Sequence, residues 1–402
     1  MPLAAVAPAL APVGLGLPIR EYLLAGGTAA VVTFLLTGLV RVLALKAGAV
    51  AWPRNRDVHT TPTPRWGGLA MFGGVLAGIG LALQLPALRL AFDYSDDVLG
   101  VVIAAALMCG VGVLDDRWEL DALTKLAGQI TAAGVLVLFG IQWAVFWVPW
   151  GGGGESSGSL LILGQGQGVL LTVLLTVALV NAMNFVDGLD GLAAGVGMIA
   201  AAATGVFAIG LVHQNGNDPS AYSPALLAAV LAGACLGFLP HNFNPARIFM
   251  GDSGSMLIGL LLAAATTGAS GKLPISVTTD GTDIVALFAP VIVVAAVMFV
   301  PLLDLLMAVI RRTRAGLSPF SPDKMHLHHR LLEIGHSHRR AVLLIYLWAA
   351  IVAFGAVALA LVDDPTVVLW AVGAGIVVAV VATLVPRDRA LAVMRRGSPT
   401  RP

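Results

Sequence analysis

The residues best suited to chemistry are concentrated at positions 181–191, which read Asn-Ala-Met-Asn-Phe-Val-Asp-Gly-Leu-Asp-Gly between two apolar runs. In hydrocarbon an unpaired amide or carboxylate costs several kcal/mol, so such groups must face water, a polar cavity or a ligand. The simpler interpretation is a tight turn, in which Gly188 and Gly191 supply the bend and an Asp caps the next helix. A turn does not also require Asn181 and Asn184, which favours a ligand-binding segment.

A second candidate site is the carboxylate pair Asp115-Asp116, which follows another apolar run. Adjacent carboxylates at a membrane boundary repel each other, and a metal ion or a positive group makes the pair easier to maintain. Lys125 follows on the same predicted loop. The alternative is a solvated helix end with Arg117 as the local partner.

A third candidate is the segment 251–255, Gly-Asp-Ser-Gly-Ser, at the start of an apolar run. A helix that begins here can present backbone N–H groups and the positive end of its dipole to a phosphate. Asp252 is then free to bind a cation. An Asp-Ser helix cap without a ligand is the alternative.

A fourth candidate is the histidine cluster His326, His328 and His329, which lies in a basic loop beside Lys324 and Arg330. Histidines with cationic neighbours suit either anion binding or zinc. Zinc is the weaker hypothesis, because the loop has no cysteine and its cations oppose a metal ion. A purely structural helix start is a further option.

The composition shows what kind of scaffold must position these segments. The 402-residue chain is 58% hydrophobic and 11% charged, with a mean hydropathy of +0.91, whereas about a quarter of a soluble protein is charged. We therefore predict an all-α, polytopic integral membrane protein, with a short external N-terminus at 1–21, one transmembrane catalytic domain at 22–385 and a basic cytoplasmic tail at 386–402. Since a crossing takes about 20 residues, eleven spans are expected, at 22–45, 67–85, 97–114, 122–141, 168–186, 189–212, 222–239, 252–269, 284–310, 341–362 and 366–385.

Positive charges are distributed unevenly between the two sides of this arrangement. All Lys and Arg residues except Arg20, Arg89 and Lys272 fall on the side that carries the C-terminus. Cytoplasmic loops carry the excess of Lys and Arg, so the N-terminus is expected outside and the C-terminus inside. The Gly/Ser-rich stretch 150–168 then lies outside, where we expect a flexible linker.

All four candidate segments fall on the predicted cytoplasmic face. Together they supply carboxylates, amides, histidines and cations. This combination suits a Mg²⁺-dependent reaction on a phosphorylated substrate, because Mg²⁺ is usually held by one or two carboxylates plus substrate phosphates. A net charge of +1 gives no sign of nucleic-acid binding, and no nucleic-acid partner is expected.

The order of the four motifs is similar to that of a known family. From about residue 56 to about residue 331, the chain resembles the polyprenyl-phosphate N-acetylhexosamine-1-phosphate transferase superfamily, glycosyltransferase family 4. The resemblance implies transfer of a sugar 1-phosphate from a UDP-sugar to a membrane polyprenyl phosphate, with release of UMP. It also implies a bacterial plasma-membrane enzyme with a cytoplasmic active site, Mg²⁺ (or Mn²⁺) as the cofactor and a role in the first membrane step of cell-envelope polysaccharide synthesis.

The same resemblance assigns roles to individual residues. The catalytic pair is Asp115 and Asp116, and the metal ligands are Asp252 and Asp187. Substrate binding falls to Lys125, Asn181, Asn184, Asp187, Asp190, His326, His328, His329 and Arg330. One departure, Leu327 between the histidines, does not affect the assignment.

The last loop also bears on the donor sugar. The branch that uses UDP-N-acetylmuramoyl-pentapeptide typically has three consecutive histidines followed by an acidic residue. The branch that uses UDP-N-acetylglucosamine resembles the run 326–331 found here, His-Leu-His-His-Arg-Leu, and is the preferred assignment. The muramoyl-pentapeptide transferase is the alternative within the family, and a secondary transporter is the alternative from another class. The oligomeric state leaves no mark on the sequence, and a homodimer stays open.

The topology can be tested with introduced cysteines. Cysteines introduced at Ser157 and Asp280 should react with a membrane-impermeant maleimide added outside intact cells. Cysteines introduced at Asp121 and Ser321 should react only after lysis. Reaction of a cysteine at position 121 from outside would show that the orientation is the reverse of the predicted one. The candidate site would then face away from the cytoplasm, where the nucleotide is.

Overall fold

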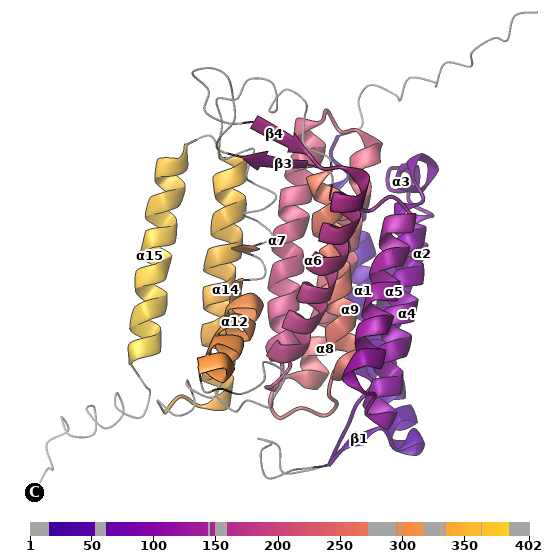
Figure 1. Cartoon of the computed structure of the whole chain (residues 1–402), viewed down its shortest axis with the longest axis vertical. Coiled ribbons are helices and arrows are strands. Elements are labelled where there is room, and N and C mark those ends of the chain that lie inside the picture. The colour runs from indigo at the N-terminus through magenta and orange to yellow at the C-terminus, as the bar shows by residue number, and fades with distance from the viewer. Residues whose placement is uncertain are drawn as a thin grey trace, which may run out of the picture.

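The computed structural model describes residues 16–52, 62–143, 145–148, 159–271, 299–314, 335–362 and 364–385, together with residues 295, 296, 316 and 331. Nearly all of this is helical (Figure 1). The helices are α1 (Ile19–Ala47), α2 (Gly67–Ala82), α3 (Arg89–Tyr94), α4 (Asp97–Trp118), α5 (Ala122–Leu138), α6 (Gln165–Val186), α7 (Leu192–Gln214), η1 (Pro219–Ala221), α8 (Tyr222–Asn242), α9 (Gly251–Ser270), α12 (Phe299–Arg314), α14 (His338–Leu361) and α15 (Pro365–Leu384). Two short antiparallel ribbons, β1 (Val50–Ala51) with β2 (Thr63–Pro64) and β3 (Val145–Val148) with β4 (Ser159–Ile162), complete the described elements.

The helices confirm a multi-pass membrane protein. Within the described residues, eight helices are long and apolar enough to cross a bilayer, and the shorter apolar helices α2 and α5 match two further predicted spans. About half of the span expected at 284–310 lies outside the described residues, so the total of eleven and the orientation of the termini stay predictions.

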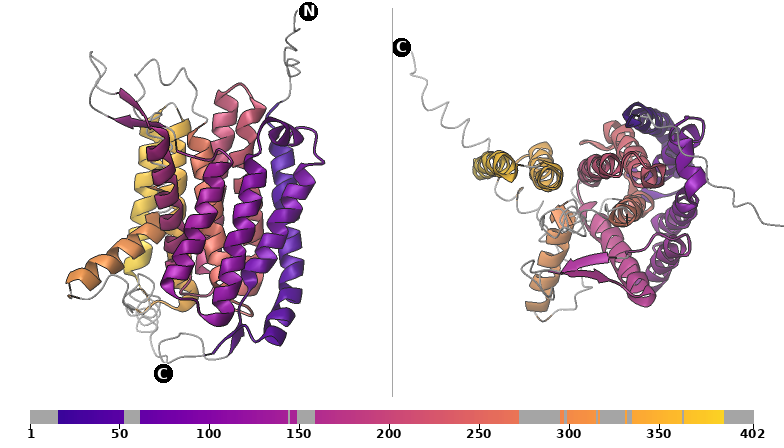
Figure 2. Two further views of the ribbon diagram at one scale, coloured as in Figure 1. Left: turned by 45° about the vertical axis from the view of Figure 1, so that its right-hand side comes forward. Right: turned by 90° about the horizontal axis from the view of Figure 1, so that it is seen from above.

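The helix α9 is at the centre of the bundle. In its most apolar stretch 94% of the residues are buried, against 11% in α15, which lies at the periphery in the view from above (Figure 2). The helices α2, α4, α6, α7 and α8 all contact α9. Since the residues around α9 are protein rather than lipid, polar groups at its start can be shielded from the bilayer.

Glycines allow the backbones around α9 to approach closely. A Cβ added to Gly112 of α4 would lie 2.3 Å from the Cα of Ser253, and one added to Gly259 would lie 2.5 Å from the Cα of Val180. Membrane helices lack a hydrophobic force between them and associate through such close packing. The N-terminus of α9 is therefore fixed directly against the C-terminal half of α4.

The predicted flexible linker at 150–168 is wrong in part. The strands β3 and β4 flank the Gly/Ser-rich residues and pair from Val145 with Ile162 to Val148 with Ser159, and α6 already begins at Gln165. The prediction was based on the glycines and serines alone. The apolar residues with high strand propensity on either side of them favour a β-ribbon.

The close approach at Gly112 predicts a marked substitution effect. In Gly112→Ala the new methyl group meets the backbone of Ser253, so α4 must move away from α9, at a cost of about 1–3 kcal/mol or more. We expect a lower thermal unfolding temperature in detergent and a loss of the transferase activity that the resemblance implies.

Gly110→Ala on the same helix is the matched control. No atom lies within 4 Å of a Cβ built at Gly110, and alanine has the higher helix propensity. This variant should keep the stability and activity of the wild type. Equal loss in both variants would show that the packing of α4 on α9 is not the cause.

Candidate active site

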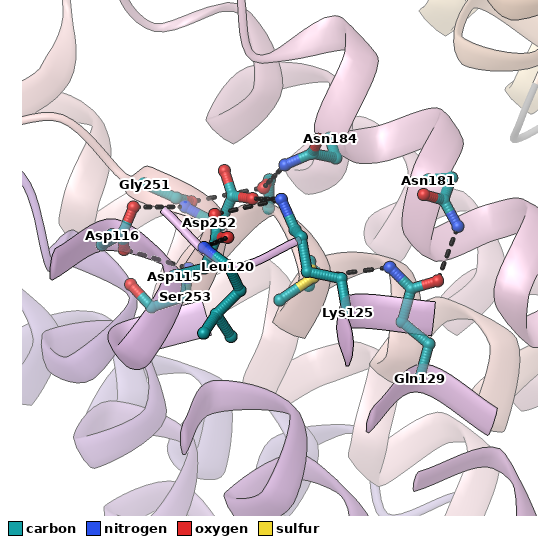
Figure 3. A network of polar contacts seen from close by, with 12 residues as sticks. Asp115, Asp116, Leu120, Lys125, Gln129, Asn181, Asn184, Gly251, Asp252 and Ser253 are labelled. Atoms are coloured by element: carbon teal, nitrogen blue, oxygen red, sulfur yellow. Dashed lines mark hydrogen bonds and ion pairs between the residues drawn. The ribbon is translucent and has the colours of Figure 1, made fainter. Parts of the chain in front are cut away.

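The ends of four helices meet at one end of the bundle and bring charged side chains together (Figure 3). The Nζ atom of Lys125, on α5, lies 3.0 Å from Oδ2 of Asp115, on α4, and also forms an ion pair with Oδ2 of Asp252, on α9. All three side chains are largely but not wholly buried. One ammonium group thus bridges two carboxylates from distant parts of the chain.

Asp116 holds the first turn of α9. Its carboxylate accepts backbone N–H bonds from Asp252 (2.9 Å) and Ser253 (3.2 Å), and α9 has no side-chain cap of its own. A carboxylate at a helix N-terminus satisfies unpaired N–H groups and complements the helix dipole. Gly251, at φ +72°, is required here because a Cβ would lie 2.3 Å from Oδ2 of Asp116.

The turn between α4 and α5 sets the position of Lys125. Asp115 accepts the backbone N–H of Leu120 at 2.9 Å, which closes the turn. Asp121 then caps α5 by accepting N–H bonds from Leu123 and Thr124, both at 3.0 Å. Hydrogen bonds from Thr124 hold the pKa of Asp121 below its usual value. Lys125 lies one helical turn beyond this cap and is directed back toward Asp115.

The two asparagines of the 181–191 motif form hydrogen bonds from α6 to the neighbouring helices α5 and α9. Asn184 donates to Oγ of Ser255 on α9 (3.1 Å), and Asn181 donates to Oε1 of Gln129 on α5 (2.7 Å). Gln129 is only 2% exposed and also contacts Sδ of Met256. No role was predicted for Gln129, although a polar side chain within an apolar helix was a usable signal.

Asp187 follows the last residue of α6, and its side chain is half-buried. Removal from water, followed by the nearby charges of Asp252 and Asp116, raises the pKa of its carboxyl to about 8, against the opposing effect of Arg65. Its side chain accepts no hydrogen bond from the residues that the structure describes. A carboxylate among other carboxylates and without a donor has the character expected of a cation ligand.

Asp190 is directed differently from Asp187. Its Oδ2 atom accepts hydrogen bonds from Nδ2 of Asn244 (2.9 Å) and the backbone N–H of Ala246 (3.0 Å), both in the loop between α8 and α9. These bonds organise that loop. The predicted contact of Asp190 with the nucleotide stays a prediction.

The remaining predicted site residues, His326, His328, His329 and Arg330, lie outside the described residues, and their roles stay predictions. Within the described residues, no three His, Cys, Asp or Glu side chains are grouped as metal ligands. Mg²⁺ needs fewer protein ligands, because it usually retains waters and binds one or two carboxylates together with substrate phosphates. Asp252 and Asp187, which accepts no hydrogen bond within the described part of the chain, fit that requirement.

The fold and the site together define a multi-pass membrane protein. Its charged site residues are concentrated where helices α4 and α6 end and helices α5 and α9 begin. A model of glycosyl transferase family 4 matches residues 98–270, which include α5, α6, α9 and all of α4 except its first residue. The chain is 58% identical over 390 residues to the decaprenyl-phosphate N-acetylglucosaminephosphotransferase of Mycolicibacterium smegmatis, covering 97% of this chain and 93% of that protein.

Two further relatives extend the comparison. The protein of the same name from Mycobacterium leprae is 61% identical over 342 residues, covering 85% of this chain and 84% of its own. A probable undecaprenyl-phosphate N-acetylglucosaminyl 1-phosphate transferase of Bacillus subtilis is 35% identical over 325 residues, covering 81% of each chain. The chain therefore belongs to glycosyl transferase family 4, which confirms the resemblance found in the motifs.

The bridging position of Lys125 predicts opposite effects on cation binding and on turnover. In Lys125→Gln the carboxylates of Asp115 and Asp252 lose their shared ammonium group, so a divalent cation should bind as tightly as in the wild type or more tightly. Turnover should fall about a hundredfold or more, as when one preorganised charged donor is removed. Mn²⁺ binding followed by electron paramagnetic resonance, beside a UMP-release assay, measures both quantities.

Lys46→Gln is the control, since this lysine lies at the C-terminal end of α1 and forms no ion pair with the described residues. It should change neither quantity. Weaker Mn²⁺ binding in Lys125→Gln would contradict the bridging role.

Proposed function

We propose that the protein transfers N-acetylglucosamine 1-phosphate from UDP-N-acetylglucosamine to a membrane polyprenyl phosphate. A phosphate oxygen of the lipid attacks the β-phosphorus of the donor, and the bond from that phosphorus to the bridging oxygen breaks. The products are polyprenyl-diphosphate-N-acetylglucosamine and UMP. The observation that carries the proposal is the Asp115–Lys125–Asp252 cluster, within a chain whose near relatives are named for this transfer.

The position of the cluster supports a reaction between a lipid and a soluble nucleotide. The cluster is built from the ends of apolar helices, where an acceptor that stays in the bilayer and a donor that stays in water can meet. Lys125 is a cationic point charge suited to phosphate oxygens. The N–H groups of Asp252 and Ser253 at the start of α9 already donate to Asp116, so the positive charge available to a phosphate here is that of Lys125.

We assign Mg²⁺ to Asp252 and Asp187, with Mn²⁺ as a substitute. When bound, the ion neutralises developing negative charge on the phosphates of the donor. Asn184 and Ser255 hold α6 against α9 through their 3.1 Å hydrogen bond and so keep the two carboxylates near each other. The positive-inside distribution of charges supports a cytoplasmic active site in the bacterial plasma membrane.

Asp115 and Asp116 position other groups in this proposal and do not act as bases. A phosphate monoester has a second pKa near 6, so roughly nine in ten acceptor molecules are dianions at pH 7 and have no proton to lose. The Asp116 carboxylate already accepts hydrogen bonds from the N-terminus of α9. The Asp115 carboxylate already accepts hydrogen bonds from Leu120 and Lys125.

This assignment predicts the pH behaviour of the variants. Asp115→Asn and Asp116→Asn should be inactive at every pH from 6 to 9, because an amide has one acceptor oxygen where each of these carboxylates accepts through two. Asp121→Asn, which changes an exposed cap on the same turn, should retain most of its activity. Recovery of Asp115→Asn or Asp116→Asn at high pH would support a general base instead.

The donor sugar provides the direct test of function. Purified protein with short-chain polyprenyl phosphate and Mg²⁺ should release UMP from UDP-N-acetylglucosamine and none from UDP-N-acetylmuramoyl-pentapeptide. Arg330→Ala should raise KM for the donor more than KM for the acceptor, since a guanidinium group donates several hydrogen bonds to a sugar or diphosphate. Equal or better use of the muramoyl donor would move the protein to the peptidoglycan branch.

The alternative from another class, a secondary transporter, has less support. Transporters place their coupling carboxylates near the bilayer midplane in broken helices, whereas Asp115, Asp187 and Asp252 all lie at helix ends. Release of UMP only when the polyprenyl phosphate is present would exclude transport as the explanation for nucleotide binding.

A further inference from the structure

The loop that carries Asp187 is held by a contact from outside the region that the family model matches. Gly191, at φ +81°, is the N-cap of α7, and its backbone N–H donates to Oδ1 of Asn242 at 3.0 Å. Its backbone carbonyl accepts a hydrogen bond from the hydroxyl of Tyr346 on α14. Both polar groups of one peptide segment are therefore fixed by side chains of two other helices.

Each of these side chains is itself fixed in place. Asn242 is 2% exposed, and its Nδ2 atom donates to the carbonyl of Ile248 at 3.1 Å, so both ends of the amide are used. The ring of Tyr346 lies on the first turn of α7, because a Cβ added to Gly195 would be 1.9 Å from its Cζ atom. Neither partner of Gly191 can turn away without losing further contacts.

A second bond from α14 reinforces the same region. Nε of Arg339 donates to the carbonyl of Asn244 at 3.0 Å, and Asn244 donates to Asp190. The segment from Asp187 to Gly191 is thus connected to α14 at both Gly191 and Asp190. Movement of α14 relative to α7 would disturb the carboxylates of this segment.

We propose that Tyr346, together with Asn242, is a positioning residue that fixes the Gly191 peptide and thereby holds the Asp187 carboxylate close to Asp252 for cation binding. The inference rests on the proposed role of Asp187 as a cation ligand. In this role Tyr346 acts through the backbone of Gly191, whose carbonyl accepts its hydroxyl. The helix α14 therefore contributes to the active site without contributing a reacting group.

The test is removal of one hydroxyl group. Tyr346→Phe keeps the ring on Gly195 and loses only the bond to Gly191. We expect Kd for Mn²⁺, measured by electron paramagnetic resonance on the purified protein, to rise about three- to tenfold, the loss that accompanies one neutral hydrogen bond. The unfolding temperature should stay within about 2 °C of the wild type, and saturating Mg²⁺ should restore most of the UMP release.

Tyr222→Phe is the matched control. The hydroxyl of Tyr222 also donates to a backbone carbonyl, that of Asn217 at 3.1 Å, but at the opposite end of α8 from Asn242. Its removal should leave Kd for Mn²⁺ unchanged. An equal rise of Kd in Tyr346→Phe and Tyr222→Phe would show that the effect comes from a general destabilisation of the fold. That result would overturn the inference.

A second variant disturbs the same hydrogen bond in a different way. Gly195→Ala retains the hydroxyl group but pushes the ring of Tyr346 away from Gly191, so it should weaken Mn²⁺ binding by a similar factor. The double variant Gly195→Ala/Tyr346→Phe should be no weaker than the poorer single variant, because both changes break the same bond. Fully additive effects would contradict the mechanism.

Failure of this inference can be distinguished from failure of the proposed function. Unchanged Mn²⁺ binding in Tyr346→Phe, or a wild type that binds no Mn²⁺, overturns the positioning role, whatever the donor assay shows. Weakened Mn²⁺ binding in a protein that releases no UMP from any UDP-sugar supports the positioning role and overturns the transferase.

Discussion

The bond between the Asp116 carboxylate and the first turn of α9 is the interaction on which the rest of the site depends. A helix that begins inside a bundle presents N–H groups that neither water nor lipid can satisfy. Asp116 satisfies two of them, at Asp252 and Ser253, and Gly112 and Gly251 allow the backbones to come close enough. Once α9 is fixed against α4, Asp252 is within reach of Lys125, and the other helix ends assemble around this pair.

Which side chains lie together at the site could largely be predicted from residue types. Carboxylates and amides at the ends of apolar runs must be kept out of the hydrocarbon. For this reason the sequence predicts that Asp115, Asn184 and Asp252 belong to one site. The bounds of the helices followed from the lengths of the apolar runs. α9, for example, was expected at 252–269 and spans Gly251–Ser270.

The direction of individual side chains was not accessible in the same way. Asp115 and Asp116 are adjacent in sequence, yet one pairs with Lys125 and the other caps α9. Asp187 and Asp190 also diverge, because the loop after α6 turns between them. Tyr346 had no sequence signal at all, since an isolated tyrosine in an apolar helix is indistinguishable from one that merely packs.

The ammonium group of Lys125 has a consequence for the biogenesis of the protein. Two carboxylates brought together during membrane insertion would repel each other in a medium of low dielectric constant, but Asp115 and Asp252 are already bridged by a positive charge of the same chain. The bundle can therefore close in the membrane before any divalent ion arrives. On the proposed assignment of Mg²⁺ to Asp252 and Asp187, metal loading would follow the closure of the bundle, and release of the nucleotide product would not loosen the helices that Lys125 holds together.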